Sequence, residues 1–474
     1  MSIINKQALE KIKQIVGEQY VKSSVAQLLA YSYDATANFQ RLPELVISPA
    51  NAEEISKVLK VCNEYNIPIV PRGSGTNLAA GTVPFDGGIV LLFNRMDKIL
   101  DFDKENLTIT VQPGLISAKL CEFVEQHGLF YPPDPSSMKI STIGGNVSEN
   151  SGGLRGLKYG VTKDYVKGLQ VVLPNGDLLQ TGGKIAKDVA GYDLTSLFVG
   201  AEGTLGIVTE ITLKLIPLPQ HKMTSIAYFN SLENAAHTVS TIIANKIIPV
   251  TLEFLDKKTI TAIEQYMHIG LSTEVEAMLL LEQDGDSHQV QQDVNEMVRI
   301  AKENGAIFTQ IAQDEQEAEQ IKTARRVALS ALSKLKPTVI LEDATVPRSE
   351  LATMVQQINR ISEKYNVNIA AFGHAGDGNL HPTCLTDIRD EDEMRRVETA
   401  FEEIFEAALA LGGTITGEHG VGEMKAPYLE WKIGPVGITV MKNLKQAFDP
   451  NNIMNPGKVF AKETKKRVVV HVGN

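Results

Sequence analysis

The sequence predicts a two-domain α+β fold in which the C-terminal tail returns to the first domain. Loops rich in Gly, Ser and Asn dominate the first part of the chain, helices and strands with few glycines follow, and Gly, Pro and Asn dominate again near the end. The proline-rich "LIPLPQ" at 215–220 is typical of a domain boundary. We therefore expect a first domain at 1–220, a second at 221–412, and a tail at 413–474 that packs on the first. The second domain should pair an antiparallel sheet with helices.

Composition argues against several classes of protein. Of the 474 residues, 43% are hydrophobic and 22% are charged, which is typical of globular domains. The net charge of −11 argues against binding of nucleic acid or of anionic membranes, since both reward basic surfaces. Cys62, Cys121 and Cys384 are far apart and form no CxxC pair, which argues against zinc ribbons and disulfide frameworks.

The chain shows no targeting or membrane-spanning pattern. The start, "MSIINKQALEKIKQIVGEQY", predicts a charged amphipathic helix and lacks the apolar region of a secretion signal. No stretch approaches the ~18 consecutive apolar residues that a transmembrane helix requires. We therefore expect a cytoplasmic protein without a transmembrane segment.

The first clear structural unit is a strand, a helix and a strand between residues 44 and 75. "ELVISP" and "IPIVPRGSG" predict the strands, and "NAEEISKVLKVCNEYN" predicts the helix, with Asn51 as its N-cap. The helix should bury one stripe, formed by Ile55, Val58, Leu59, Cys62 and Tyr65.

Later segments follow the same logic. Residues 86–217 contain short runs typical of β-strands, such as "GGIVLLF", "LTITVQPG" and "LQVVLPNGDLLQ", separated by long polar loops. "DEDEMRRVETAFEEIFEAALALGG" predicts a helix that ends at the C-cap Gly412. Its apolar stripe consists of Met394, Val397, Phe401, Ile404, Ala408 and Leu411.

Three glycine-rich loops lie among the predicted strands of the first domain. "PRGSGTNLAAG" at 71–81 allows backbone N–H groups to converge on an anion, with Ser74, Thr76 and Asn77 as further donors. It matches neither GxGxxG nor a P-loop, so on its own it is explained equally well as a plain turn. Two more such loops, at 131–153 and 200–211, suggest one long cofactor bound across many backbone turns.

Three of the nine histidines fall between residues 374 and 419. "NVNIAAF" and "LHPTCL" predict two strands joined by "AGDGN", and Asp-Gly is a strong hairpin signal. Such a hairpin brings His374 and His381 to one end of a ribbon, where two imidazoles and a carboxylate suit Zn, Fe or Mn. In "TGEHGVG", chemistry alone allows either Glu418 or His419 as the third ligand. The alternative is that these histidines are structural and hydrogen-bonded within the fold.

The three loops together resemble the FAD-binding domain of the vanillyl-alcohol oxidase/PCMH superfamily. The later segments "GHAGDGNLHP", "GEHGVG" and "DPNNIMNPGK" resemble its glycolate oxidase/D-lactate dehydrogenase branch. The similarity covers roughly residues 40–460 and is highly specific as a combination. It implies a PCMH-type FAD-binding fold for the first domain and the returning tail, with an α/β cap that carries the metal hairpin.

The resemblance also implies which residues hold FAD. The first two loops would hold the pyrophosphate, the second would also approach the isoalloxazine, the third would line the adenosine side, and the tail would return toward the flavin. The residues so assigned are Pro71, Arg72, Gly73, Ser74, Gly75, Thr76, Asn77, Gly81, Asp134, Pro135, Ser136, Ser137, Thr142, Gly145, Asn146, Asn150, Gly153, Glu202, Gly203, Gly206, Ile207 and Asn455. The first loop contains no histidine that could tether the flavin, so we expect non-covalent FAD.

The family pattern assigns the remaining chemistry. Glu418 would bind a divalent transition metal (Zn, Mn or Fe) with His374 and His381, which leaves His419 as the catalytic base. Arg325, in "IKTARRVALSAL", resembles the carboxylate-binding arginine of the family, because a guanidinium fork matches a carboxylate. The alternative for Arg325 is an ordinary surface position on a helix.

These roles imply oxidation of a D-2-hydroxy acid to the 2-oxo acid by hydride transfer to FAD. The acid would chelate the metal, a Lewis acid that makes its hydroxyl easier to deprotonate, and an imidazole with an unperturbed pKa of ~6.5 would accept the proton. Leu329, Leu341 and Thr383 stand where relatives that handle a second carboxylate would use polar groups. This favours glycolate or D-lactate over D-2-hydroxyglutarate.

Three alternatives compete with this hypothesis. One is the same scaffold acting on D-2-hydroxyglutarate or another alcohol; another is a metal-dependent hydrolase in which His374, His381 and Glu418 activate water. The third is a subunit that binds FAD or a partner without catalysis. The expected partners are a small 2-hydroxy acid and an electron acceptor: an iron–sulfur or flavoprotein subunit, a quinone, a cytochrome or oxygen. A membrane-bound acceptor would place the protein at the membrane periphery, and a homodimer is a further option.

Overall fold

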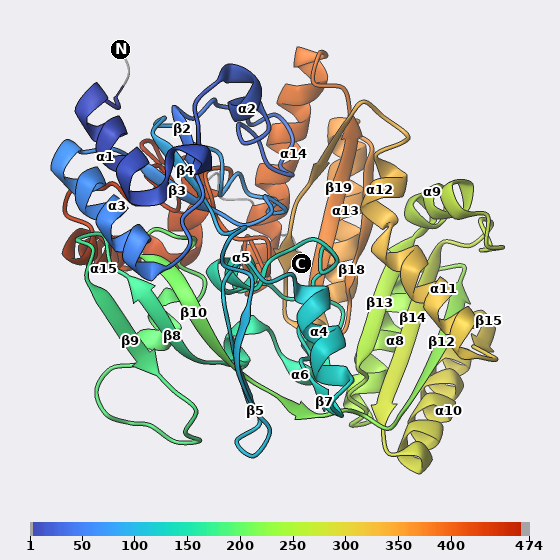
Figure 1. The fold of residues 1–474 in the computed structure, drawn as a ribbon. Coiled ribbons are helices and arrows are strands. Elements are labelled where there is room, and N and C mark those ends of the chain that lie inside the picture. Colours follow the sequence, from blue (N-terminus) through green and yellow to red (C-terminus); the bar gives the residue numbers. More distant parts are fainter. Residues whose placement is uncertain (1–2, 466–474) are drawn as a thin grey trace. The chain divides into compact units, whose positions relative to one another are not determined.

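The computed structural model describes residues 3–465 and divides them into two compact units. The first unit contains the described residues up to Ser151, then Val161–Leu218 and Glu418–Lys465. The second contains Gly152–Gly160 and Pro219–Gly417 (Figure 1). Residues 466–474 of the expected tail lie outside the described residues.

The first unit begins with a four-stranded sheet in the order β1 (Val21–Lys22), β2 (Leu45–Ile47), β4 (Ile89–Leu92), β3 (Ile69–Arg72). Strands β2, β4 and β3 are parallel, and helix α3 (Ala52–Tyr65) connects β2 to β3. The Asn51 side chain caps this helix by accepting the Glu54 N–H at 2.9 Å, and the predicted apolar stripe is buried apart from Tyr65. The strand–helix–strand prediction is therefore confirmed.

A second sheet of the first unit is antiparallel, in the order β5 (Ile99–Asp103), β6 (Thr108–Val111), β10 (Ile207–Lys214), β8 (Val166–Val172), β9 (Leu178–Gly182). Two of the predicted β-type runs lie in this sheet, "LTITVQPG" on β6 and "LQVVLPNGDLLQ" on β8 and β9, whereas "GGIVLLF" forms β4 of the first sheet. A small pair joins β7 (Leu129–Phe130) to β11 (Ile216–Pro217). Besides α3, the α-helices of this unit are α1 (Lys6–Val16), α2 (Val25–Leu29), α4 (Ser117–Glu125), α5 (Ile143–Glu149), α7 (Leu194–Phe198) and α15 (Leu429–Phe448).

The C-terminal segment returns to the first unit, as predicted. Ile69 of β3 donates its N–H to the Ile453 carbonyl at 2.8 Å, and Asn455 donates its N–H to the Ile69 carbonyl at 2.8 Å. These bonds add residues 453–455 to the edge of β3, directly before the first glycine-rich loop. Tail and loop are thereby fixed to each other by backbone hydrogen bonds.

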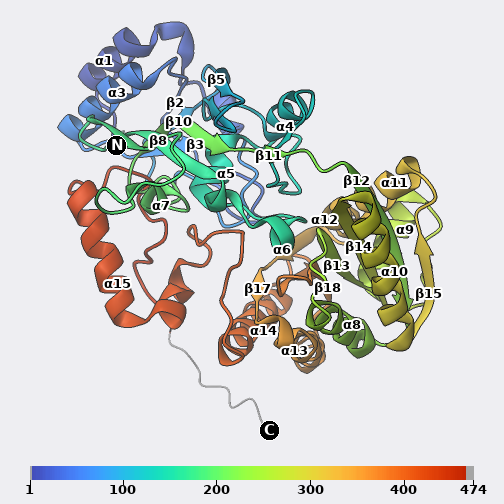
Figure 2. The same ribbon diagram turned by 90° about the horizontal axis from the view of Figure 1, so that it is seen from below.

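The second unit is an antiparallel sheet in the order β15 (Ala306–Ile311), β12 (His221–Phe229), β14 (Ala277–Gly285), β13 (Thr251–Asp256), β18 (Ile369–His374), β19 (Asn379–Thr386), β16 (Thr338–Leu341). The short β17 (Ala344–Thr345) also pairs with β19. Its helices are α6 (Gly156–Tyr159), α8 (Leu232–Ala244), α9 (Lys257–Met267), α10 (Ser287–Glu303), α11 (Glu315–Arg326), α12 (Ala328–Leu332), α13 (Leu351–Tyr365) and α14 (Glu391–Ala410). Figure 2 shows α8, α10, α13 and α14 along one face of this sheet.

The limits of the units differ in detail from the predicted domain limits. Residues 413–417 stay with the second unit because Thr414 pairs with Thr345, and because the Thr416 hydroxyl and the Gly417 N–H bond to Asp343. Residues 152–160 also belong there, because Lys158 and Tyr159 bond to the Asp284 carboxylate at 2.6 and 2.8 Å.

Alternation along the strands separates two faces of the second unit's sheet. Leu252 and Phe254 of β13 lie in the hydrophobic core with Leu279 and Leu281 of β14. Glu253, between the two core residues of β13, therefore points to the opposite face. The same alternation places Ala371 and Leu380 in the core, and it directs Phe372, His374, His381 and Thr383 to the face with Glu253.

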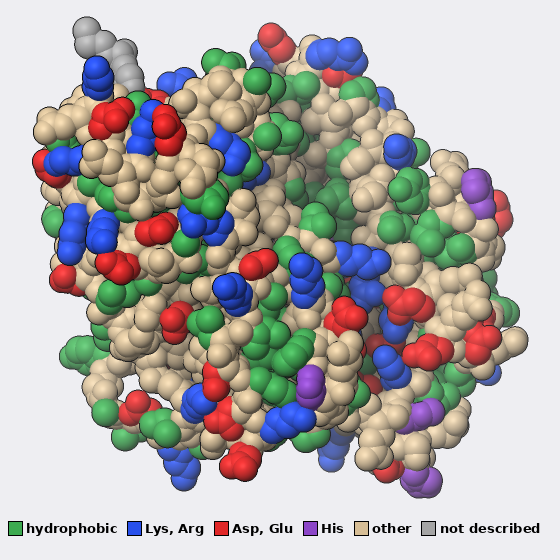
Figure 3. All heavy atoms as spheres, in the orientation of Figure 1, with side chains coloured by type: hydrophobic (Ala, Val, Ile, Leu, Met, Phe, Trp, Pro, Cys, Tyr) green, Lys and Arg blue, Asp and Glu red, His purple; other side chains and the backbone are tan. Residues whose placement is uncertain are grey.

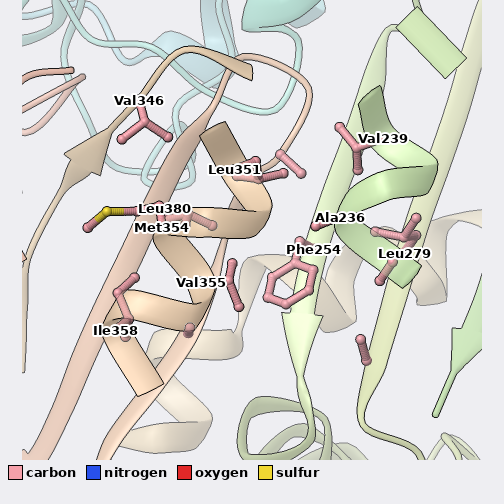
Figure 4. Close-up of a cluster of buried hydrophobic side chains, with 14 of the residues drawn as sticks. Ala236, Val239, Phe254, Leu279, Val346, Leu351, Met354, Val355, Ile358 and Leu380 are labelled. Carbon is pink, nitrogen blue, oxygen red and sulfur yellow. The ribbon is translucent and has the colours of Figure 1, made fainter. Parts of the chain in front are cut away.

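Phe254 anchors this core, and truncating it should destabilise the second unit strongly. Its ring is fully buried among side chains of α8 and α13, including Ala236 and Val355 (Figure 4). We expect Phe254→Ala to lower the free energy of unfolding by about 3–5 kcal/mol in urea denaturation. Ile307→Ala, at a side chain that is 56% exposed on β15, is the control and should change it by less than about 0.5 kcal/mol. Equal effects of the two substitutions would contradict this description of the core.

Candidate functional site

The first glycine-rich loop lies against the second loop of the first unit. A Cβ atom on Gly73 would collide with the Thr142 hydroxyl, and the Ser74 hydroxyl donates to the Ile140 carbonyl at 2.5 Å. Gly75 has φ +70°. Both positions favour glycine, Gly73 because it lies close to Thr142 and Gly75 because of its positive φ. The surface of the loop at these positions is therefore formed by backbone atoms.

The third loop and the tail complete the same region. A Cβ atom on Gly203 would collide with the Pro71 ring. The Asn455 side-chain amide donates to the Gly81 carbonyl at 3.0 Å and to the Glu202 carbonyl at 2.8 Å. Its carboxamide oxygen is buried without a hydrogen-bond partner among residues 3–465. All four predicted FAD-binding segments therefore have residues that meet in the first unit, although Gly153 at the end of the second loop belongs to the second unit.

Several of the predicted FAD residues have side chains that maintain the loops. Arg72 donates to the Tyr33 carbonyl at 2.7 Å, and burial lowers the pKa of its guanidinium. Asn77 donates to Asp34 at 2.9 Å, and Asn146 donates to the Ser117 hydroxyl at 2.8 Å. Gly206 packs against Val171 of β8, where a Cβ atom would not fit. The backbone of the loops is thus the surface best suited to a ligand.

The remaining predicted residues are divided between the units. Thr142 accepts the Gly145 N–H at 3.2 Å and caps α5. Gly153 differs from the others because it belongs to the 152–160 segment of the second unit. The others lie in the first unit: Thr76, Asp134, Pro135, Ser136, Ser137, Asn150 and Ile207.

These loops fit FAD. The surface of the loops consists of peptide groups and buried polar atoms. Neighbouring side chains leave no room for a Cβ atom at Gly73 or Gly203, and the side-chain oxygen of Asn455 is buried without a hydrogen-bond partner among the described residues. Such surfaces bind phosphate and ring heteroatoms through N–H groups without needing a basic side chain.

Glu149 and Glu202 form a pair of buried carboxyl groups in the first unit. The sequence predicted Glu202 as a binding residue but not Glu149. Glu202 accepts the N–H groups of Val421 and Gly422 at 2.7 and 2.6 Å. Glu149 faces Gly420, where a Cβ atom would collide with Oε2 of Glu149, and this oxygen has no hydrogen-bond partner among the described residues. Burial, followed by the negative charges of Glu202 and Asp34, raises the pKa of Glu149 well above its usual value. Glu149 therefore holds its proton to higher pH than an ordinary glutamate does.

The raised pKa of Glu149 makes stability depend on pH. Because the pKa of Glu149 is higher in the folded chain, the unfolded chain loses this proton first as pH rises above about 4.5, and folding stability falls as pH rises toward the folded pKa. Glu149→Gln cannot lose a proton, so its free energy of unfolding should rise relative to the unsubstituted protein between pH 5 and pH 8. The slope is at most about 1.4 kcal/mol per pH unit.

Urea denaturation at several pH values, with FAD in excess, measures this difference. The exposed Glu105→Gln is the control and should show no such trend. A pH-independent difference for Glu149→Gln would mean that Glu149 is ionised in the folded protein.

The second unit contains the predicted histidine hairpin. His374 ends β18 and His381 is the third residue of β19, with the turn held by Asp377, which accepts the Asn379 N–H at 3.2 Å. Gly378 in the turn has φ +85°. The two imidazoles are buried, and their ring centroids are 5.1 Å apart at 90°. The predicted hairpin and the convergence of its histidines are confirmed.

A buried carboxylate joins this hairpin to helix α11. One oxygen of Glu253 accepts from Nδ1 of His374 at 2.7 Å, and the other accepts from Nε of Arg325 at 2.5 Å. Arg325 is only 3% exposed, and its guanidinium carbon lies 4.8 Å from the centre of the Phe372 ring. A surface position for Arg325 is therefore wrong. Nothing local in the sequence identified Glu253.

The chain leaves the second unit beside a second buried carboxylate. Asp343 is fully buried and accepts the Thr416 hydroxyl at 2.8 Å and the Gly417 N–H at 2.7 Å. Its other oxygen is 3.9 Å from Nδ1 of His381. Glu418 and His419 follow directly in the chain as the first residues of the next part of the first unit, with His419 Nε2 3.8 Å from Glu418 Oε1.

The donor set of the hairpin fits a divalent transition metal. A carboxylate only accepts hydrogen bonds, so the His374 Nδ1 carries the proton and its Nε2 keeps a lone pair. Two neighbouring imidazoles, one of them oriented by a carboxylate, are ligands that zinc, manganese or iron sites use.

The surface and the helices add two observations. Basic and acidic side chains are interspersed over the visible surface in Figure 3. Among the helices of residues 3–465, none combines the length and the apolar character needed to cross a bilayer.

Two family models match the chain. The C-terminal domain of FAD linked oxidases matches residues 218–459, and an FAD binding domain matches residues 43–182. Glycolate oxidase subunit GlcD of Bacillus subtilis (strain 168) is 62% identical over 98% of this chain and 99% of its own length. D-lactate dehydrogenase of Anaerostipes hadrus is 35% identical over 97% and 98%.

Solved structures agree on the fold. The crystal structure of p-cresol methylhydroxylase with substrate bound has a TM-score of 0.80 at 19% identity, covering 96% of both chains. The predicted two-domain PCMH-type architecture is therefore confirmed. The chain belongs to the FAD-linked oxidases, in the branch of glycolate oxidase subunit GlcD and D-lactate dehydrogenase, and is an FAD-dependent oxidoreductase.

Proposed function

We propose that this protein oxidises a short D-2-hydroxy acid, glycolate or D-lactate, to the 2-oxo acid. The observation that carries the proposal is the buried arrangement of Arg325, Glu253 and His374 beside His381 on one sheet face. It supplies a carboxylate-binding group and metal-ligating groups in one unit of an FAD-linked oxidase. The relatives named as a glycolate oxidase subunit and a D-lactate dehydrogenase support the substrate class.

FAD is held without a covalent bond by the three loops and Asn455 of the first unit. When bound, it accepts the two electrons that leave the substrate. The side chains of Arg72 and Asn77 keep the first loop in place through Tyr33 and Asp34. The backbone of the loops is then rigid before the ligand arrives, which lowers the entropy cost of binding.

His374, His381 and Glu418 are the proposed metal ligands. When bound, a divalent metal polarises the substrate hydroxyl and carboxylate. Glu253 orients the His374 ring for this role. Glu418 follows Gly417, which Asp343 holds by its N–H, so one end of this segment is fixed.

Arg325 and His419 act on the substrate itself. Arg325 binds the carboxylate through the guanidinium N–H groups that Glu253 does not use, and its Nη2 has no hydrogen-bond partner among the described residues. His419 accepts the hydroxyl proton on an imidazole nitrogen as the Cα–H bond breaks. These two residues orient the acid and move its proton.

The lining near the hairpin favours a small substrate. Leu341 pairs with Thr383 across β16 and β19, and the Thr383 hydroxyl donates a hydrogen bond to the His381 carbonyl at 3.1 Å. Neither residue offers a cation to a second carboxylate, and Leu329 on α12 does not either. A monocarboxylate such as glycolate or D-lactate therefore suits this surface better than D-2-hydroxyglutarate.

Anaerobic flavin reduction tests the proposal. The purified protein should be yellow, should release FAD on denaturation, and should be bleached by D-lactate or glycolate faster than by L-lactate or D-2-hydroxyglutarate. A colourless protein without FAD that hydrolyses esters or amides would support a metal hydrolase instead. A yellow protein that no 2-hydroxy acid bleaches would support a non-catalytic subunit. Fastest bleaching by D-2-hydroxyglutarate would overturn the substrate assignment.

The electrons must then leave the flavin. One relative is named as a subunit of glycolate oxidase, which supports an electron-accepting partner subunit for this chain. An iron–sulfur or flavoprotein subunit fits this role, since either accepts electrons from a reduced flavin.

A further inference from the structure

We propose that Glu253 is a positioning residue that fixes the metal-binding histidine and the carboxylate-binding arginine relative to each other. The inference rests on the proposed function, because it assigns Glu253 to the same site. It adds a residue that belongs to none of the sequence motifs. Its role is to set, through one side chain, how far the bound carboxylate lies from the metal.

The position of Glu253 is rigid. The residue lies on β13 between Leu252 and Phe254, which are both buried in the core. Strand β13 is paired on both sides, with β14 and β18, and the side chain is fully buried. Its two oxygens bind two different groups, Nδ1 of His374 and Nε of Arg325. The carboxylate therefore cannot rotate without losing one of them.

Each bond has a separate consequence. The bond to His374 fixes the ring tautomer, so Nε2 presents its lone pair in one direction. The bond to Arg325 uses Nε, and the Phe372 ring lies against the guanidinium, so the Nη groups have little freedom to turn. A substrate carboxylate held by Arg325 thus lies at a set distance from a metal held by His374.

The same sheet face provides a matched control. Glu282 of β14 is also buried, at 6% exposure, and pairs with a cation of α11, Lys322, at 3.2 Å. It also accepts the Thr224 hydroxyl at 2.8 Å. Glu282 therefore reproduces the buried carboxylate and its ion pair with α11, but its known bonds involve no histidine. Glu282→Gln therefore measures how the loss of a buried ion pair with α11 affects metal affinity and KM when the bond to His374 is kept.

The experiment compares Glu253→Gln with Glu282→Gln in the full chain with FAD bound. Affinity for Zn²⁺ and Mn²⁺ is measured by chelator competition, and kcat and KM are measured with D-lactate. Glu253→Gln should weaken metal binding roughly 10- to 100-fold and raise KM, with FAD content unchanged. Glu282→Gln should leave metal affinity and KM within about twofold.

A second variant covers the case in which Glu253→Gln does not fold. Glu253→Leu combined with Arg325→Met removes both charges together, so no unpaired charge remains buried. It should fold, bind FAD, and show the same loss of metal affinity, since His374 again lacks its carboxylate.

The outcomes separate the two proposals. Unchanged metal affinity in both Glu253 variants, in a protein that does oxidise D-lactate, overturns the role of Glu253 and leaves the proposed function intact. An unsubstituted protein that neither binds metal nor oxidises a 2-hydroxy acid overturns both. If Glu253→Gln and Glu282→Gln lose metal affinity to the same extent, Glu253 contributes only a structural ion pair, and its positioning role is overturned.

Discussion

Replacing both hairpin histidines, His374→Ala with His381→Ala, should abolish oxidation of 2-hydroxy acids while the protein stays yellow. The histidines belong to the second unit, whereas the proposed FAD loops, apart from Gly153, belong to the first. Their loss removes two metal ligands and with them the polarisation of the substrate hydroxyl, which is worth several kcal/mol. We expect kcat/KM to fall by at least about 1000-fold.

Metal content, extractable FAD and turnover are measured on the same preparation. His288→Ala is the control, because His288 is an exposed histidine of the second unit on α10. It should change none of the three quantities. Substantial turnover by the double variant would remove the metal from the mechanism, and loss of FAD would show that the hairpin affects the first unit.

His419→Ala should retain FAD and metal but lose most of the flavin reduction. The substitution removes the proposed base, and general base catalysis contributes about 100- to 10,000-fold in rate. His419 adjoins Glu418 in the chain, with Nε2 3.8 Å from its carboxylate oxygen. The expected loss is therefore in kcat, with little change in metal affinity.

Stopped-flow reduction under anaerobic conditions separates this step from reoxidation. Added imidazole should restore part of the rate in His419→Ala, because it can accept the proton in place of the missing ring. Undiminished reduction without imidazole would exclude His419 as the base. Loss of the metal would instead make His419 a ligand, which is the alternative that chemistry alone left open.

Much of the fold could be predicted because its signals are local. Helix α3 carries its N-cap, Asn51, and its buried stripe in consecutive residues. Helix α14 ends at Ala410 with Leu411 as its C-cap, one residue before the predicted C-cap Gly412, which has φ +82°. The hairpin of β18 and β19 was predicted from the strand-like runs "NVNIAAF" and "LHPTCL" and from the Asp377-Gly378 turn between them, since these signals lie within a few residues of one another.

Glu253 could not be predicted because its role depends on register between distant strands. In "TLEFLD" it looks like the polar residue of an alternating strand, typical of a solvated face. Only the pairing of β13 with β18 brings it to His374, 121 residues away along the chain. Glu149 is similar, because its environment depends on Glu202 and Gly420 from two other segments.

Arg325 illustrates the limit of helix patterns. Helix α11, "EQEAEQIKTARR", is so polar that a solvated helix is the natural interpretation, and the sequence placed Arg325 on a helix without fixing its burial. The buried side of α11 is set by carboxylates on the sheet below it, at Glu253 for Arg325 and at Glu282 for Lys322. Charged residues inside a fold become interpretable only when their partners are known.

Anaerobic flavin reduction by D-lactate, with and without metal, tests the central claim that oxidation of the acid requires a metal bound by the histidine hairpin. The metal-loaded protein should bleach rapidly. The same protein after chelation should bleach at least about 100-fold more slowly and recover when Mn²⁺ or Zn²⁺ is returned. Equal rates with and without metal would contradict the account.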